Sequence, residues 1–179
     1  MLWDERLTEL AVSVDRRGVD TSQKHWRIIA VWRTRNGSWD DVPTWARQWQ
    51  QDTLGGDHHA FGRALFADGT LAPQAGFVLG WPDGVDGRTP EPDGWANIPL
   101  FAGYNPAQGP GPYSWAKAGN AEKLVGLGLP HNHHVSFFAV WQEMEPGTPE
   151  PPPTGEWITV EVDVAGVLLL PNVRVRVVA

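Results

Sequence analysis

Apolar and polar positions alternate along much of this chain, and the alternation predicts short β-strands separated by turns. One example lies between residues 60 and 66, where two faces can be assigned, with Ala60, Gly62, Ala64 and Phe66 on one and Phe61, Arg63 and Leu65 on the other. Asp-Gly pairs at 68–69, 83–84 and 93–94 supply residues that tolerate the positive φ of tight turns. These patterns predict an all-β protein built as an antiparallel β-sandwich.

Further strands are expected over 7–14, 25–34, 113–117 and 133–141. The segment 25–34 is apolar nearly throughout, which predicts burial of both of its faces. One short helical insertion is expected at about 41–52. There, Pro43 suits a first helical turn, and Trp45 and Trp49 are four residues apart on one face.

The composition changes at Glu145, and the change divides the chain into a body (1–144), a linker (145–155) and an arm (156–179). The linker holds five prolines in eleven residues, which predicts an extended polyproline II segment. The arm alternates strictly and predicts a β-hairpin with a wholly aliphatic face. Its assembly residues are Trp157, Val160, Val162, Val164, Val173, Val175 and Val177. Because a lone hairpin is only marginally stable in water, we expect this aliphatic face to be buried against the body or against a neighbouring subunit.

Charge and composition narrow the possible partners. The formal net charge of −7 argues against a nucleic-acid surface, since phosphate binding needs clustered Lys and Arg. The absence of cysteine excludes disulfides and thiolate metal sites. Two acids among the first five residues argue against a signal peptide, and the sequence holds no run of about 20 apolar residues that could cross a membrane.

Tryptophan is over-represented, with eleven residues against two tyrosines. These side chains fill a core, or some of them form an exposed platform on which sugar rings or a partner protein can stack. The candidates for such a platform are Trp39, Trp45, Trp49, Trp81 and Trp95.

Five of the six histidines lie in two clusters, which raises the question of a metal site. The candidate ligands are Asp57, His58, His59, His131 and His133, with spacing and chemistry that suit zinc or another divalent ion. Adjacent residues on a strand point to opposite faces, so only one of each pair could reach a common ion. The alternative is that these histidines bond to backbone at strand ends. We expect no cofactor and no enzymatic activity, because the serines lack a Gly-x-Ser-x-Gly elbow and the loop carboxylates lack a fixed separation.

The segment AFGRALFADGTLAPQAGFVLGWPDG, followed by WANIP, resembles prealbumin-like (transthyretin-like or carboxypeptidase-regulatory-like) β-sandwich domains. A wider likeness over 7–142 includes HWRIIAVWR and GLGLPHNHHVSFFAVWQ and resembles accessory modules of bacterial and phage-type cell-wall hydrolases. Such modules are non-catalytic, and the resemblance implies the same here. The sequence departs from them because it has no hydrolase domain and adds a Pro-rich segment and a hairpin after Trp141.

Together these patterns favour a non-enzymatic structural or attachment module, such as a capsid decoration or tail protein of a virion. It is expected to form a homo-oligomer through its C-terminal arm and to act on the virion or at the cell exterior. Two alternatives stay open. One is a module that binds cell-wall glycan through exposed tryptophans, and the other is a metal-dependent hydrolase that uses the histidines.

Overall fold

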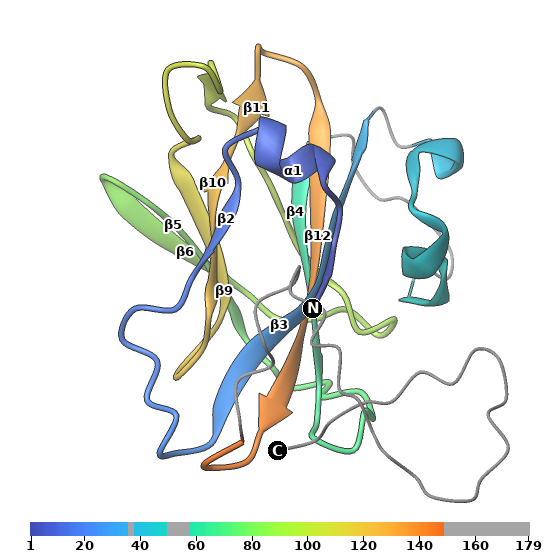
Figure 1. Ribbon diagram of the computed structural model, residues 1–179, viewed down its shortest axis with the longest axis vertical. Coiled ribbons are helices and arrows are strands. Elements are labelled where there is room, and N and C mark those ends of the chain that lie inside the picture. The colour runs from blue at the N-terminus through green and yellow to red at the C-terminus, as the bar shows by residue number, and fades with distance from the viewer. Residues whose placement is uncertain (36–37, 50–57, 149–179) are drawn as a thin grey trace, which may run out of the picture. The chain divides into compact units, whose positions relative to one another are not determined.

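The computed structural model describes residues 1–35, 38–49 and 58–148, and this part of the chain is all-β (Figure 1). Most strands belong to two five-stranded sheets. The first sheet has the order β1 (Leu2–Trp3), β3 (His25–Arg35), β12 (Val135–Met144), β4 (His59–Leu65) and β7 (Ala96–Pro99). The second has the order β2 (Ser13–Asp15), β10 (Lys123–Leu127), β9 (Tyr113–Lys117), β5 (Phe77–Trp81) and β6 (Gly84–Arg88). A short pair joins β8 (Gly103–Tyr104) to β11 (Leu129–Pro130).

The first sheet is mixed, which corrects the expectation of a purely antiparallel arrangement. Strand β12 pairs antiparallel with β3 but parallel with β4, and β1 pairs parallel with β3. Parallel neighbours need a long crossover connection. The connection from β4 to β12 is long because it includes strands of the second sheet, and the chain returns so that β12 runs in the same direction as β4.

The N-terminal strand expected over 7–14 is wrong in its first half. The helix α1 spans Arg6–Glu9, and only Ser13–Asp15 form a strand, β2. The Leu10 amide donates to Leu7 O, which closes a helical turn, and Leu7 is fully buried. The apolar spacing of Leu7 and Leu10 fits a helical face, and this overrides the alternation of the following residues.

The expected helical insertion consists of two short 3₁₀ helices in its described part, η1 (Trp39–Asp41) and η2 (Thr44–Trp49). Residues 50–52 of the expected helix lie outside the described residues. The Ala46 amide donates to Pro43 O, an i→i+3 bond of the tighter 3₁₀ type. The insertion lies beside the first sheet, on the side away from the second sheet (Figure 1).

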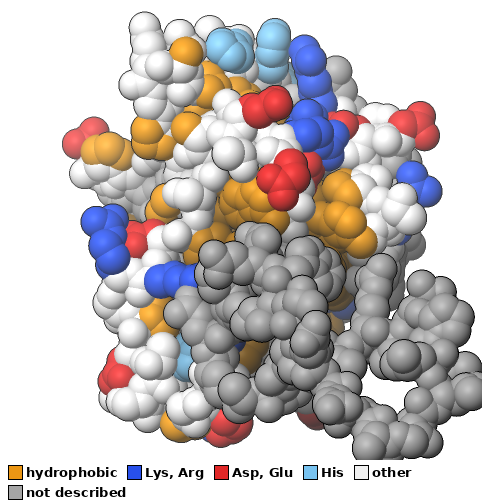
Figure 2. Space-filling view, viewed as in Figure 1, with side chains coloured by type: hydrophobic (Ala, Val, Ile, Leu, Met, Phe, Trp, Pro, Cys, Tyr) orange, Lys and Arg blue, Asp and Glu red, His pale blue; other side chains and the backbone are white. Residues whose placement is uncertain are grey.

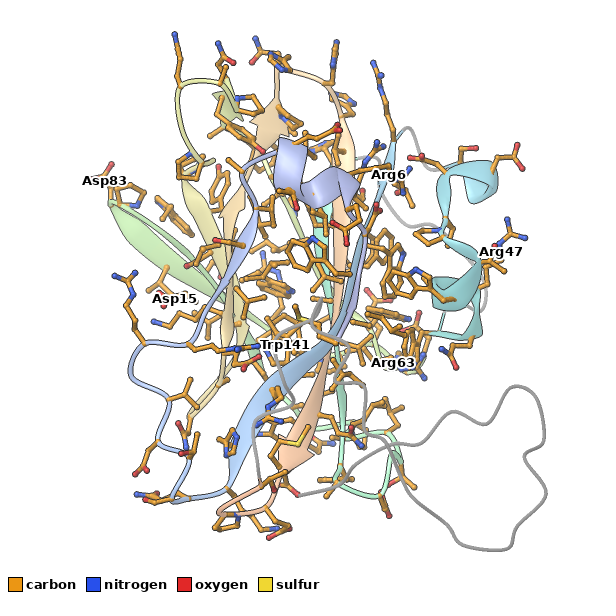
Figure 3. All side chains as sticks on the ribbon, viewed as in Figure 1. Arg6, Asp15, Arg47, Arg63, Asp83 and Trp141 are labelled. Carbon is orange, nitrogen blue, oxygen red and sulfur yellow. The ribbon has the colours of Figure 1, made fainter. Side chains whose placement is uncertain are left out.

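One hydrophobic core contains side chains from both sheets, and it confirms the two faces assigned to 60–65. The placement of Phe66 on the core face is wrong, because β4 ends at Leu65 and Phe66 is 43% exposed. Ala60 and Ala64 belong to this core, whereas Phe61 and Leu65 point to the opposite face of the sheet. Gly62 allows a close approach, because a Cβ there would lie 2.6 Å from the Phe77 ring. Trp141 lies at the centre of the core between the sheets, where its Nε1 donates to Glu122 O at 2.9 Å (Figure 3).

A second core covers the outer face of the first sheet. It contains Trp32, Phe61, Trp95, Phe138 and Val140, and the η1–η2 insertion packs on it through Val42 and Ala46. Strands β3 and β12 are therefore buried on both faces, as the apolar run at 25–34 predicts.

The expected linker begins with residues that contact the body. Lys24 Nζ lies 2.9 Å from Glu145 Oε1, and the Gly147 amide donates to Thr21 O at 3.1 Å. The rest of the linker and the whole arm, with Trp157 and the six valines, lie outside the described residues.

Candidate functional site

Three of the five candidate tryptophans pack against the first sheet. Trp45, Trp49 and Trp95 surround the fully buried Trp32, with ring centroids 5.9, 6.0 and 5.9 Å from it. Trp95 is 8% exposed, and its Nε1 donates to Trp49 O. Their rings therefore serve as packing in what we call the Trp32 cluster (Trp32, Trp45, Trp49, Trp95, Phe61 and Phe138). The side chain of Trp39 lies outside the described residues.

Trp81 is different, because it lies at the end of β5 and borders an open groove of about 280 Å³. We call this hollow the Trp81 groove, and its lining residues are Leu79, Trp81, Asp86, Arg88, Ile98, Pro99, Phe101 and Tyr113. They come from the β5–β6 hairpin, from the first residue of β9, Tyr113, and from β7 and the loop residue Phe101. Strands β6 and β7 are edge strands of their sheets, so the groove lies along the open side of the two layers.

The hairpin sequence positions the Trp81 ring. Trp81 pairs with Gly84 across the Pro82-Asp83 turn, whose Asp83 lies at the projecting tip of the hairpin (Figure 3). A Cβ on Gly84 would lie 2.7 Å from Cζ2 of Trp81, so the indole rests against the glycine backbone. Because residues two apart share a face, Trp81 stands on the same side of β5 as the buried Leu79, beyond the end of the core.

The opposite wall depends on Tyr113. Its hydroxyl accepts hydrogen bonds from the amides of Phe101 at 3.4 Å and Ala102 at 3.2 Å, which holds the loop after β7 against β9. The Phe101 side chain is 72% exposed. The Tyr113 ring also meets Trp81 edge to face, with centroids 6.3 Å apart. Two exposed aromatic side chains thus border the groove on a scaffold of strands.

Polar groups complete the groove. Arg88 Nη1 lies 2.9 Å from Asp86 Oδ2, and both side chains are more than 40% exposed. A carboxylate accepts hydrogen bonds and a guanidinium donates several, so the pair offers both functions to a polar ligand. Aromatic faces next to a few convergent polar groups are the usual composition of a small-ligand site.

The five clustered histidines, His58, His59, His131, His133 and His134, lie toward one end of the body, but their arrangement differs from the one considered for a metal ion. His58 Nδ1 donates to Leu100 O at 2.7 Å, and its ring lies 5.0 Å from that of His134, which is not among the candidate ligands. His59 lies 5.2 Å from His58, and His131 lies 6.4 Å from His133. Asp57 lies outside the described residues. In the described part of the chain, no group of three or more His, Asp or Glu side chains has the geometry to hold a metal ion.

Sequence reasoning placed Trp81 among the candidates but missed Phe101, Tyr113, Asp86 and Arg88. The i, i+2 spacing of Asp86 and Arg88 on a strand was the available signal, because it puts both side chains on one face. Nothing in the sequence near Phe101 distinguishes an exposed phenylalanine from a core residue.

No protein-family model, no curated protein and no solved structure matches this chain. None of the helices in the described ranges is long and apolar enough to cross a membrane. The geometry of the site is therefore the basis for a functional assignment.

Proposed function

We propose that this protein is a non-enzymatic attachment module of the prealbumin-like β-sandwich kind, and that it binds cell-wall glycan through the Trp81 groove. The observation that carries the proposal is the pair of exposed rings, Trp81 and Phe101, that line one groove with an exposed ion pair. Two five-stranded sheets that share one core support the fold part of the proposal.

The apolar and polar parts of a sugar ring match the aromatic and charged side chains of the Trp81 groove. The C–H face of a pyranose ring is apolar and packs on an indole or phenyl face, while its hydroxyls need hydrogen-bond partners when water is displaced. Asp86 would accept from hydroxyls and Arg88 would donate to them. Because the two charges lie 2.9 Å apart and offset one another, a neutral sugar suits the groove better than a charged one.

Calorimetric titration of the full-length protein with soluble peptidoglycan fragments tests this proposal. We expect saturable binding that weakens at least tenfold in Trp81→Ala and in Phe101→Ala, a loss of about 1.4 kcal/mol. Phe66→Ala is the matched control, since Phe66 is 43% exposed but is not part of the groove lining. Flat titrations of the wild-type protein, or equal affinity in Trp81→Ala, would contradict the proposal.

A second candidate function is assembly through the C-terminal arm, as in a virion decoration or tail protein exposed at the exterior. Its support is the strict valine alternation in the sequence of the arm, together with the anchoring of Glu145 and Gly147 on the body. The partner would be another copy of the chain or a different subunit of the same particle.

Light scattering of full-length variants tests the assembly function. The double variant Val162→Asp with Val175→Asp places charges on the aliphatic face, and we expect it to reduce the mass of the assembly to that of a monomer. By the alternation of the sequence, Glu161 belongs to the opposite face of the expected strand, so Glu161→Gln should leave the assembly intact. A monomeric wild-type protein would exclude self-assembly through the arm.

A further inference from the structure

A second cavity, of about 290 Å³, lies where β3 ends beside the turn between β11 and β12. We call it the Arg35 pocket, and it is lined by Glu9, Leu10, Arg33, Arg35, Pro130, His131, His133 and Val135. Figure 2 shows histidine and basic side chains next to each other at this end of the molecule, at the top of the view. The pocket shares no lining residue with the Trp81 groove.

Strand register brings the two arginines to the pocket. Arg33 and Arg35 are two residues apart on β3, so they share a face, and they pair with Phe137 and Val135 of β12. Arg33 Nη1 lies 2.9 Å from Asp41 Oδ2, while its Nε is buried without a hydrogen-bond partner among the described residues. The guanidinium of Arg33 is therefore held in place with one donor still unused.

The charge of Arg35 is not balanced in the same way. Its backbone amide donates to Asp41 Oδ2 at 2.6 Å, but no carboxylate in the described ranges forms an ion pair with its guanidinium. Asp41 is instead engaged by the side chains of Arg6 and Arg33 (Arg6 is labelled in Figure 3). Among the groups that line the pocket, Glu9 carries the negative charge, against the positive charges of Arg33 and Arg35.

The turn that carries the histidines has an unusual backbone. His131 and Asn132 both have positive φ, 51° and 57°, which residues other than glycine rarely adopt. The turn is held by hydrogen bonds from the His131 amide to Tyr104 O at 2.7 Å and from the His133 amide to Pro130 O at 2.9 Å. Such conformations persist where the surrounding structure imposes them, and they are concentrated at functional sites. Here the turn presents two imidazoles to the pocket.

We propose that the Arg35 pocket binds a small oxyanion, a phosphate or carboxylate group of a larger ligand. The forked guanidinium of Arg35 would make paired hydrogen bonds to two oxygens, and the two imidazoles would supply further donors. The Arg35 pocket goes beyond the glycan groove and does not depend on it, because the two share no lining residue. The pocket is lined by two arginines and two histidines, whereas the groove combines aromatic rings with a balanced ion pair.

Sulfate is the first probe, because it is a small oxyanion with two negative charges. We expect a sulfate titration of the full-length protein, followed by the ring proton signals of His131 and His133, to saturate.

Three variants make the result decisive. Arg35→Gln should lose at least tenfold in sulfate affinity, whereas Arg47→Gln, which removes an exposed arginine of η2, should keep it. His131→Asn removes one imidazole but keeps a residue that tolerates positive φ, so it should weaken sulfate binding while the fold is retained. Glycerol phosphate and acetate, titrated in parallel, show whether the pocket selects a phosphate or a carboxylate. Shifts that do not saturate, or equal affinity in Arg35→Gln and Arg47→Gln, would overturn the proposal.

Discussion

Tryptophan has different roles in the Trp32 cluster and in the Trp81 groove. The cluster covers the outer face of the first sheet, whereas the groove lies along the edge strands β6 and β7. In the cluster, Trp32 is fully buried and stacks on Phe138 with ring centroids 5.2 Å apart. In the groove, Trp81 is 36% exposed and rests on the backbone of Gly84. The rings in the cluster contact other rings, while one side of the groove wall is open to solvent.

The difference shows that strand position, and not tryptophan content, decides which aromatic side chains are available for binding. Trp32 sits in the middle of β3, where the η1–η2 insertion covers the outer face of the sheet. Trp81 follows the last buried position of β5, Leu79, so its ring extends past the core. Three experiments can break or sharpen this comparison, and a fourth, on an exposed ion pair elsewhere on the surface, sets the lower end of the scale.

The largest effect is expected from Trp32→Ala. Removing a fully buried aromatic side chain leaves a cavity between Trp49 and Phe138 and should lower the free energy of unfolding by about 3–5 kcal/mol. Trp81→Ala, by contrast, should cost less than about 1 kcal/mol, as exposed positions do. Urea denaturation followed by far-ultraviolet circular dichroism measures both, and equal losses would remove the distinction between the two regions.

Arg63→Met should have the next largest effect. The Arg63 guanidinium lies over the Trp95 ring at 5.6 Å, and its Nη1 donates to Trp49 O at 2.9 Å. Burial lowers the pKa of Arg63, which is consistent with a charge held against the cluster. Loss of the cation–π contact and the hydrogen bond should cost about 1–2 kcal/mol in the same denaturation experiment. Arg47→Met on η2 is the control and should cost almost nothing, since Arg47 is exposed (Figure 3).

Gly84→Ala tests the support of the groove. The added methyl group would lie 2.7 Å from the Trp81 ring, so the ring must leave its place on the hairpin. Because this ring can turn toward solvent, we expect a stability loss below about 1 kcal/mol, smaller than that of overpacking a closed core. Glycan affinity should fall nonetheless. Gly87→Ala, whose methyl group would lie 3.7 Å from Phe77 O, should change neither quantity.

The smallest effect concerns a surface ion pair outside both regions. Arg17 holds the pKa of Asp15 down at about 2 through side-chain and backbone hydrogen bonds. Because the folded-state pKa is lowered, the stabilisation is present above pH ~4 and is lost as pH falls toward 2. Arg17 is 92% exposed, so Asp15→Asn should cost less than about 1 kcal/mol at neutral pH. The difference from wild type should disappear near pH 2, and a constant difference at all pH values would contradict this assignment.

Local patterns in the sequence predict much of the fold. Alternation assigns the faces of β4 correctly, and the uninterrupted apolar run of β3 predicts burial on both sides. The pairing of β12 with β4 could not be predicted, because it depends on where the chain returns after visiting the other sheet. The strand expected over 7–14 is wrong in its first half because the alternation of Leu10, Val12 and Val14 outweighs the helical spacing of Leu7 and Leu10 when the sequence is considered alone.

The candidate site was less predictable than the fold. The sequence proposes Trp81 together with Trp45, Trp49 and Trp95, but exposure separates Trp81 from Trp95, and exposure is set by residues far along the chain. The contribution of Tyr113, which fixes the Phe101 loop, arises from a contact between β9 and the segment after β7.

The central position of β12 in the first sheet has a consequence for synthesis on the ribosome. This strand is the last of the described body to be made, yet it separates β3 from β4. Until it leaves the exit tunnel, the edges of β3 and β4 that face β12 lack their hydrogen-bonding partner. The nascent polypeptide must therefore wait for nearly its full body length before cooperative folding, a delay in which chaperones would find exposed hydrophobic segments.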